Sequence, residues 1–380
     1  MKSSHLRKFL AVPALGALVL GLSSPVRAED GFRQYNLVSD QPGVAAHLDP
    51  NLVNPWGIAT SGSSPFWISD NGPGLSTLYN TPGIPQALVV SIPGPTGAPA
   101  APTGVVFNST TSFNRDNFIF ATEDGTISGW RGALGSVAEI LIDNSAAASY
   151  KGIAFGTVGT DNNIYAANFA QNRIDAYSSP STLATLTGTF TDPLLPAGYA
   201  PFNIQNIGGS LFVTYAVVGP TGDDVAGPGN GILDKYDLNG NLLMRFASAG
   251  ALNSPWGLAR APGTFGAFAN DLLVGNFGDG TINAYDFTSG TYIGALNDES
   301  GNPLSIDGLW GLRFGNGGNG GRADTLYLTA GPDDEQHGLF AAIAPVPEPS
   351  TYGFAASLAL AGVSTLARFR RQRGRKLIHA

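Results

Sequence analysis

The sequence predicts an all-β fold built from one repeated unit, and two observations lead to that prediction. The first is composition: the 380 residues include 51 Gly and 26 Pro, while only 13% are charged. Turn formers are therefore abundant, and short β-branched and aromatic runs take the place of any long apolar pattern with the helical period. The second is self-similarity along the chain with a period of about 50 residues.

The repeat is clearest at Pro55-Trp56-Gly57, Pro255-Trp256-Gly257 and Leu309-Trp310-Gly311. Three weaker copies complete a series whose anchor positions are Gly57, Gly104, Gly152, Asn203, Gly257 and Gly311. Each copy continues with a second strand that ends in small or polar residues and a third strand that ends near an aromatic residue. Fourth strands are expected in five copies, over residues 87–92, 138–142, 183–190, 242–246 and 292–296.

Six units of four short strands indicate a six-bladed β-propeller, because radial stacking buries both faces of sheets that are too thin to stand alone. Glycine on the inner strand lets neighbouring blades approach closely near the axis. A β-helix is the main alternative, but its repeats are much shorter. The sixth unit lacks a fourth strand after Phe340, so we predict that the stretch Phe32 to Val38 pairs as its outer strand and closes the ring.

Both ends of the chain carry export features. Residues 1–28 read as a secretory signal peptide, with three basic residues, an uncharged stretch and small residues before a cut after Ala28. Near the other end, the uncharged run from Thr351 to Ala367 would span roughly 26 Å as a helix, near the lower limit for a bilayer. The basic cluster from Arg368 to Lys376 would stay cytoplasmic. A plain C-terminal membrane anchor is the alternative interpretation.

The residues before that run are Val346, Pro347, Glu348 and Pro349, and together the three parts resemble a PEP-CTERM sorting signal. The resemblance implies processing by exosortase, after signal peptidase has acted, in a Gram-negative bacterium that makes exopolysaccharide. It also implies a product exported to the cell surface or extracellular matrix, with a transient inner-membrane anchor. We therefore divide the chain into a signal peptide (1–28), a propeller (29–345) and a sorting signal (346–380).

The net charge of the chain between the two terminal segments limits the classes of partner that it can be expected to bind. Four of the 20 basic residues lie in residues 1–28 and six follow Glu348, which leaves ten bases against all 28 acids, a formal charge of −18. Such a body repels phosphate backbones and anionic lipid surfaces, so nucleic acid is not an expected partner and membrane contact is expected only through the C-terminal segment before processing. The absence of Cys rules out thiol catalysis and Cys-bound metals.

The repeats resemble NHL-type and streptogramin-lyase-like propellers. A closer resemblance is to an uncharacterised propeller family found with PEP-CTERM tails, carried by the stretches at residues 35–40, 49–57, 310–317 and 330–340. It covers essentially the whole mature chain and implies the fold, but no activity has been assigned to that family.

Two groups of residues are candidate sites. His47 and His337 are the only histidines of the mature body, and adjacency of the first and last blades would bring them together with Asp49 and Glu335. Such a group suits a divalent ion, Ca²⁺ or another, or acid–base chemistry. The alternative is that each histidine fills an ordinary hydrogen-bonding position. Glu335 and His337 also invite comparison with the His and Glu that streptogramin lyases use, although spacing alone does not support that mechanism.

The second group consists of acids in loops that follow second strands: Asp70, Glu123, Asp124 and Asp279. Six-bladed lactonases hold a divalent ion with Glu, Asn and Asp at the axial mouth, but this chain does not match their full ligand pattern. The alternative is that these acids hydrogen-bond their own backbone in tight turns. Asp223-Asp224, in a long Gly/Pro loop, is a further calcium candidate without the ligand spacing of an EF-hand.

Aromatic residues divide into two sets. Trp56, Trp256 and Trp310 share one repeat position, which predicts core packing between blades. Tyr199, Phe202 and Phe277 are candidates for stacking on sugar rings.

The sequence favours a noncatalytic binding or structural protein of the cell surface or exopolysaccharide matrix. The alternative is a metal-dependent hydrolase, lactonase or lyase at one axial mouth. A mouth filled by side chains favours the first, and a tightly held divalent ion favours the second.

Overall fold

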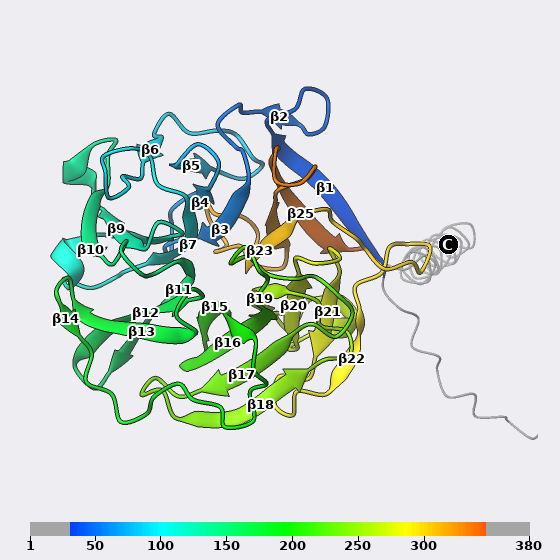
Figure 1. Ribbon diagram of the computed structural model, residues 1–380. Helices are drawn as coiled ribbons and strands as arrows, with labels where there is room; N and C mark the ends of the chain where they lie inside the picture. The colour runs from blue at the N-terminus through cyan, green and yellow to red at the C-terminus, as the bar shows by residue number, and fades with distance from the viewer. Residues whose placement is uncertain (1–30, 347–380) are drawn as a thin grey trace, which may run out of the picture.

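The structure is a computed structural model that describes residues 31–346. Within that range, six sheets surround a central axis as blades (Figure 1). The all-β prediction and the blade number are confirmed.

Each of the first five blades is one four-stranded antiparallel sheet whose innermost strand comes first in the chain. The first contains β3 (Pro55–Ala59), β4 (Phe66–Asp70), β5 (Leu75–Tyr79) and β6 (Val90–Ser91). The second contains β7 (Pro102–Phe107), β8 (Phe118–Thr122), β9 (Thr126–Trp130) and β10 (Glu139–Asp143). The third contains β11 (Tyr150–Val158), β12 (Asp161–Asn168), β13 (Arg173–Ser179) and β14 (Thr182–Leu183).

The fourth blade contains β15 (Tyr199–Ile207), β16 (Ser210–Val217), β17 (Ile232–Tyr236) and β18 (Leu242–Ser248). The fifth contains β19 (Pro255–Arg260), β20 (Leu272–Asn276), β21 (Ile282–Tyr285) and β22 (Tyr292–Ala295). Three short 3₁₀ helices lie in connecting segments: η1 (Phe113–Arg115), η2 (Gly132–Leu134) and η3 (Gly266–Phe268). The outer strands β6 and β14 are shorter than expected, which limits the row of unpaired backbone groups at those two blade edges.

The sixth blade closes the ring with both ends of the described chain. It contains β23 (Leu309–Phe314), β24 (Leu326–Ala330), β25 (Leu339–Pro345) and β1 (Phe32–Ser39), with β2 (His47–Leu48) added in parallel beside β1. β1 pairs antiparallel with β25 from Phe32↔Pro345 to Ser39↔Leu339, which confirms the predicted closure. The Phe32 ring is buried 5.0 Å from the ring of Phe265, so this strand also joins the core between the last two blades.

The anchor glycines set how closely the blades meet at the axis. A Cβ atom on Gly57 would lie 2.5 Å from the carbonyl oxygen of Thr103 on the next inner strand, and one on Gly311 would lie 2.6 Å from the carbonyl oxygen of Trp56. No side chain fits at those distances. In the degenerate copy, the side-chain amide of Asn203 donates to the carbonyl oxygen of Trp256 at 2.7 Å and so replaces backbone contact with a hydrogen bond.

The predicted signal peptide, and the sorting signal from Pro347 onward, lie outside the described residues. Between residues 31 and 346, no helix has the length and apolar character needed to cross a bilayer.

Candidate functional site

One end of the axis is filled by the side chains that immediately precede the anchors. Around the ring these are Trp56, Thr103, Lys151, Phe202, Trp256 and Trp310. The rings of Trp56 and Trp310 stack with centroids 3.6 Å apart, and Trp256 meets both edge-on. The Nε1–H of Trp256 donates across the axis to the carbonyl oxygen of Lys151 at 2.9 Å. The three tryptophans are core residues, as predicted, but they form an axial plug rather than a layer between two blades.

The three aromatic residues predicted to stack on sugar rings differ in how deeply they are buried. Phe202 is fully buried in the plug, so it presents no free ring face. Phe277 is half-buried and stacks on Trp310 with centroids 4.0 Å apart, at the edge of the plug. Tyr199 is half-buried against the core between the third and fourth blades.

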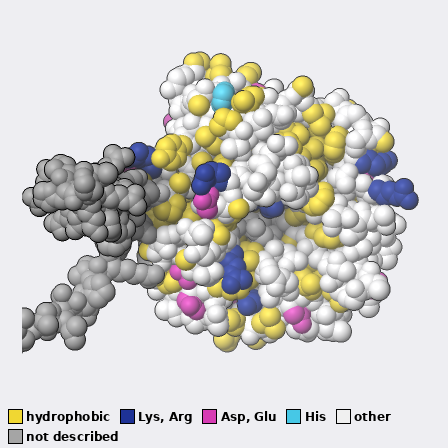
Figure 2. Space-filling model, turned by 180° about the vertical axis from the view of Figure 1, so that it is seen from behind, with side chains coloured by type: hydrophobic (Ala, Val, Ile, Leu, Met, Phe, Trp, Pro, Cys, Tyr) yellow, Lys and Arg dark blue, Asp and Glu magenta, His cyan; other side chains and the backbone are white. Residues whose placement is uncertain are grey.

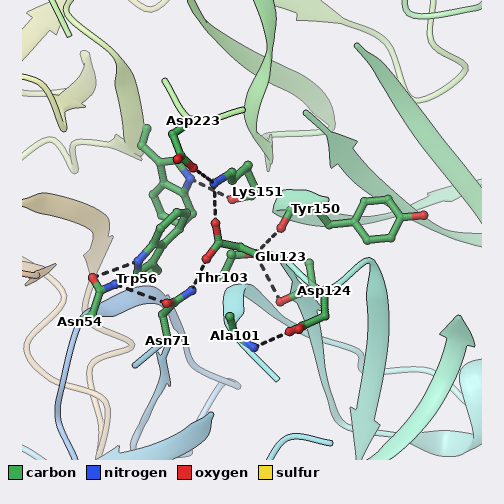
Figure 3. Close-up of polar contacts among 12 residues, drawn as sticks. Asn54, Trp56, Asn71, Ala101, Thr103, Glu123, Asp124, Tyr150, Lys151 and Asp223 are labelled. Atoms are coloured by element: carbon green, nitrogen blue, oxygen red, sulfur yellow. Dashed lines mark hydrogen bonds and ion pairs between the residues drawn. The ribbon is translucent and has the colours of Figure 1, made fainter. Parts of the chain in front are cut away.

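A chain of polar contacts covers the plug (Figure 3). The Lys151 ammonium forms ion pairs with Glu123 and, at 3.4 Å, with Asp223. It also lies over the rings of Trp56 and Phe169, at 5.4 and 5.9 Å from their centroids. The other oxygen of Glu123 accepts from the side-chain amide of Asn71 at 2.8 Å. The lysine is only 4% exposed, so this is a buried charge held by two carboxylates and two aromatic faces.

Asn54 connects this polar layer to the plug. Its side-chain oxygen accepts from the Trp56 Nε1–H at 3.0 Å, and its amide donates to Asn71 at 3.3 Å. The loops that follow the second strands and the segments that precede the inner strands therefore meet at one mouth of the ring.

Electrostatics at this mouth raise the pKa of Lys151 and of two acids close to it. Burial alone would lower the pKa of Lys151, but Glu123 and Asp223 outweigh it, so the pKa is raised. Burial raises the pKa of Glu335 to about 7, with the Glu123 charge adding to it and Lys151 opposing it. Burial also raises the pKa of Asp224, which Ser254 and Lys151 oppose. Two carboxylates thus pair with the ammonium group, and its charge also acts on Glu335 and Asp224.

Three buried polar atoms in and beside the plug have no hydrogen-bond partner among the described residues: Oε1 of Glu335, Oδ2 of Asp224 and Nε1 of Trp310. Buried polar atoms without partners are costly, so a change in the surrounding side chains or an enclosed water molecule would satisfy them.

The structure does not bring the four residues of the predicted shared metal site together as one group. His337 Nδ1 lies 2.8 Å from a carboxylate oxygen of Asp40, while Asp49 accepts from the Tyr79 hydroxyl at 2.9 Å. His47 lies on β2, beside Val38 of β1. Only Glu335 belongs to the mouth. Across residues 31–346, no group of three or more His, Asp or Glu side chains is arranged to hold a metal ion.

The predicted loop acids mostly have structural contacts. Asp70 is fully buried and accepts from the Thr77 backbone N–H at 2.9 Å, and burial raises its pKa well above the ordinary value. Asp279 accepts from the backbone and hydroxyl of Thr281, as the turn alternative expects. Asp124 accepts from the Ala101 N–H at 2.6 Å. Glu123, from the same set, is the one that reaches the mouth.

Sequence reasoning missed Lys151 as a functional candidate. The signal was present, because Lys151 occupies the repeat position that holds tryptophan in three other blades. A lysine at a position that is tryptophan in three other blades indicates that the lysine has a specific partner there.

No model of a known protein family matches the chain. Uncharacterized protein R648 of Acanthamoeba polyphaga mimivirus is 33% identical over 302 residues, which cover 76% of this chain and 75% of the viral protein. Uncharacterized protein L690 of the same virus is 32% identical over 302 residues, with 76% and 80% covered. The chain belongs to the family of these viral proteins. Neither relative's description gives an activity.

Solved structures share the fold. A glucose dehydrogenase has a TM-score of 0.50 at 14% identity, covering 83% of this chain and 99% of that one. A streptogramin B lyase has a TM-score of 0.48 at 12% identity, covering 83% and 97%. At these identities the likeness concerns the propeller architecture alone.

Proposed function

We propose that this chain is an exported propeller of the bacterial cell surface or exopolysaccharide matrix. We also propose that it binds a polyhydroxylated ligand noncatalytically at the mouth formed by Lys151, Glu123, Asp223, Asn54 and Asn71, called the Lys151 mouth below. The observation that carries the proposal is the layer of polar groups at one mouth, where the carboxylates of Glu123 and Asp223 meet the Lys151 ammonium and the Asn71 amide. Sugar hydroxyls donate and accept together, so one ligand can supply partners to carboxylate oxygens and to amide groups.

The surroundings of those groups support the same ligand class. Phe277 lies at the edge of the aromatic plug, where a sugar ring can stack beside it. Asn54 and Asn71 add amide groups close to Glu123. An aromatic surface next to carboxylates and carboxamides combines apolar contact with directional hydrogen bonds, which suits a neutral, hydroxyl-rich molecule better than an anion.

Export and processing complete the proposal. The features of residues 1–28 and 346–380 support secretion followed by exosortase cleavage at Pro347-Glu348-Pro349. Substituting Glu348→Ala should cause the unprocessed chain to accumulate in the inner membrane, as measured by mass and by membrane fractionation. Unchanged processing of that variant would remove the exosortase part of the proposal and leave the binding part intact.

Binding is tested with the protein purified from its producing cells and the polysaccharide of those cells. The wild-type protein should be retained on immobilised polysaccharide, and Glu335→Gln together with Glu123→Gln should weaken retention by about tenfold or more. Glu299→Gln is the matched control, because Glu299 is an exposed acid paired with Arg33 away from the mouth. Absence of affinity for polysaccharide or any surface component would refute the binding role.

A second function is supported by the pKa of about 7 at Glu335, which suits a general base close to a charged lysine. The enzyme alternative is then a hydrolase, lactonase or lyase at the same mouth. Turnover of lactones or of the polysaccharide, lost in Glu335→Gln and retained in Glu299→Gln, would establish it. Sensitivity of that turnover to chelators distinguishes a metal-dependent reaction from acid–base chemistry by side chains alone.

A further inference from the structure

The opposite end of the axis is open. Beyond the plug, the later halves of all six inner strands line a cavity of about 260 Å³. Figure 2 shows the molecule hollowed near its middle on the face away from the viewer of Figure 1, with a basic side chain at the edge of the hollow. The walls are largely backbone and aliphatic side chains, such as Ile58, Val105 and Leu258, and no Asp or Glu is among the lining residues.

Arg313, on β23, is the one cation that lines this cavity. Its Nε–H donates to the Thr60 hydroxyl at 3.0 Å, and one Nη2–H donates to the Thr60 carbonyl oxygen at 3.3 Å. A guanidinium carries five N–H groups, so three of them have no partner within residues 31–346.

The other bases of the described chain are compensated differently. Six of the ten form ion pairs with acids: Arg33, Arg131, Lys151, Arg173, Arg245 and Arg322. Arg115 and Arg260 are exposed to solvent, and Lys235 lies over the Phe212 and Phe287 rings. Arg313 therefore differs from the rest, because it is a half-buried guanidinium that has neither an acid nor a ring face as partner.

A charge that is partly removed from solvent and lacks a counter-charge is stabilised when an opposite charge binds beside it. Burial lowers the pKa of Arg313 to about 10, which still leaves it protonated at neutral pH. The cavity thus holds a permanent positive charge with free donors.

A second donor lies two blades away, on the wall that the fourth blade contributes to the same cavity. Gln205, on β15, is half-buried and lines the same cavity, and its side-chain amide has no hydrogen-bond partner in the part of the chain that the structure describes. The volume exceeds that of a cavity of about 150 Å³, which is known to hold benzene. A small organic molecule therefore fits.

We propose that this cavity is a binding site for the carboxylate group of a small organic acid, with Arg313 as the charged donor and Gln205 as a second donor. The planar guanidinium matches the two oxygens of a carboxylate. A carboxylate is favoured over phosphate because one cation balances one negative charge, whereas a phosphate dianion would require a second cation that the walls lack. The aliphatic walls then contact the apolar part of the acid.

The test is calorimetric titration of the purified full-length protein with acetate, benzoate, glucuronate, inorganic phosphate and the neutral analogue benzamide. At least one carboxylate should bind, and benzoate should bind more tightly than benzamide. Arg313→Gln should weaken carboxylate binding by about tenfold or more, as expected when a charge-assisted hydrogen bond is lost. Arg260→Gln is the matched control, because it removes the same charge from an exposed position on the adjacent inner strand.

Gln205→Leu provides a second variant if Arg313→Gln does not fold, and it should weaken binding less. Failure of all three carboxylates to bind, equal affinity for benzoate and benzamide, or unchanged affinity in a folded Arg313→Gln protein would overturn the site. Tighter binding of phosphate than of any carboxylate would overturn the assignment to organic acids. Retention on polysaccharide at the Lys151 mouth is an independent measurement, so the two proposals can fail separately.

Discussion

The two ends of the axis are built from the same six inner strands, yet they differ in almost every property. One end is filled by Trp56, Trp256 and Trp310 and covered by four acids around one buried lysine. The other is an open cavity with one guanidinium and no acid in its walls. The difference arises at two repeat positions, one residue before each anchor and two residues after it. A propeller can therefore diversify each mouth separately, while the anchors between them hold the ring constant.

The largest effect is expected from removing part of the plug. Trp310 is 1% exposed and stacks on both Trp56 and Phe277, so Trp310→Ala should lower the free energy of unfolding by about 3–5 kcal/mol. Chemical denaturation measures the change. Trp130→Ala is the matched control: Trp130 lies on the partly exposed outer part of the second blade and should cost clearly less. Equal losses would mean that the axial plug has no special role in stability.

Removing the lysine charge from the plugged end should cause the next largest loss in the free energy of unfolding. Lys151→Met leaves Glu123 and Asp223 close together without their cation, which should cost about 3 kcal/mol at neutral pH. Adding Glu123→Gln to that variant should restore part of the loss, because it removes one of the two unpaired charges. A double variant no more stable than the single one would contradict this account of the ion pair.

The acids at that end also predict how stability depends on pH. Because the pKa of Glu335 is about 7 in the folded protein and near 4.5 ordinarily, the folded state binds more protons between those values. Stability should therefore fall as pH rises from about 4.5 to about 7 and then level off, and Glu335 should contribute about 3 kcal/mol of that fall. Glu335→Gln should flatten the profile by that amount in thermal or denaturant unfolding. A steeper profile in the variant would reverse the predicted sign.

The smallest effect is expected when the charge at the open end is removed. Arg313 has no acid partner to leave behind, so Arg313→Met should change the free energy of unfolding by less than about 1 kcal/mol. Comparison with Lys151→Met in the same denaturation experiment isolates the role of the counter-charges. Comparable losses for the two variants would show that the two cations are not stabilised differently.

The repeat carried most of the fold information. The spacing of Gly57, Gly104 and Gly152 located inner strands, since close approach at the axis permits no side chain there. The missing outer strand after Phe340 indicated the pairing of β1 with β25. These features follow from local sequence and from the need to bury every sheet face.

The site was harder to predict, because its residues come from different blades. Sequence adjacency associated Glu335 with His337, whereas the turn after β24 directs Glu335 to the axis and His337 to Asp40. Lys151 and Arg313 looked like ordinary bases, since only the ring closure shows which of them has an acid within reach. Side-chain direction within loops, unlike strand spacing, depends on tertiary contacts that the repeat does not encode.

The joined ends of the chain have a mechanical consequence. The Val346 N–H donates to the Gly31 carbonyl oxygen at 2.7 Å, so the described chain begins and ends at one point of the sixth blade. A force applied at Val346 would first load β25, which is hydrogen-bonded to β24 on one side and to β1 on the other. The load would then be shared by two ladders, and a protein held from that point would resist peeling of its last strand.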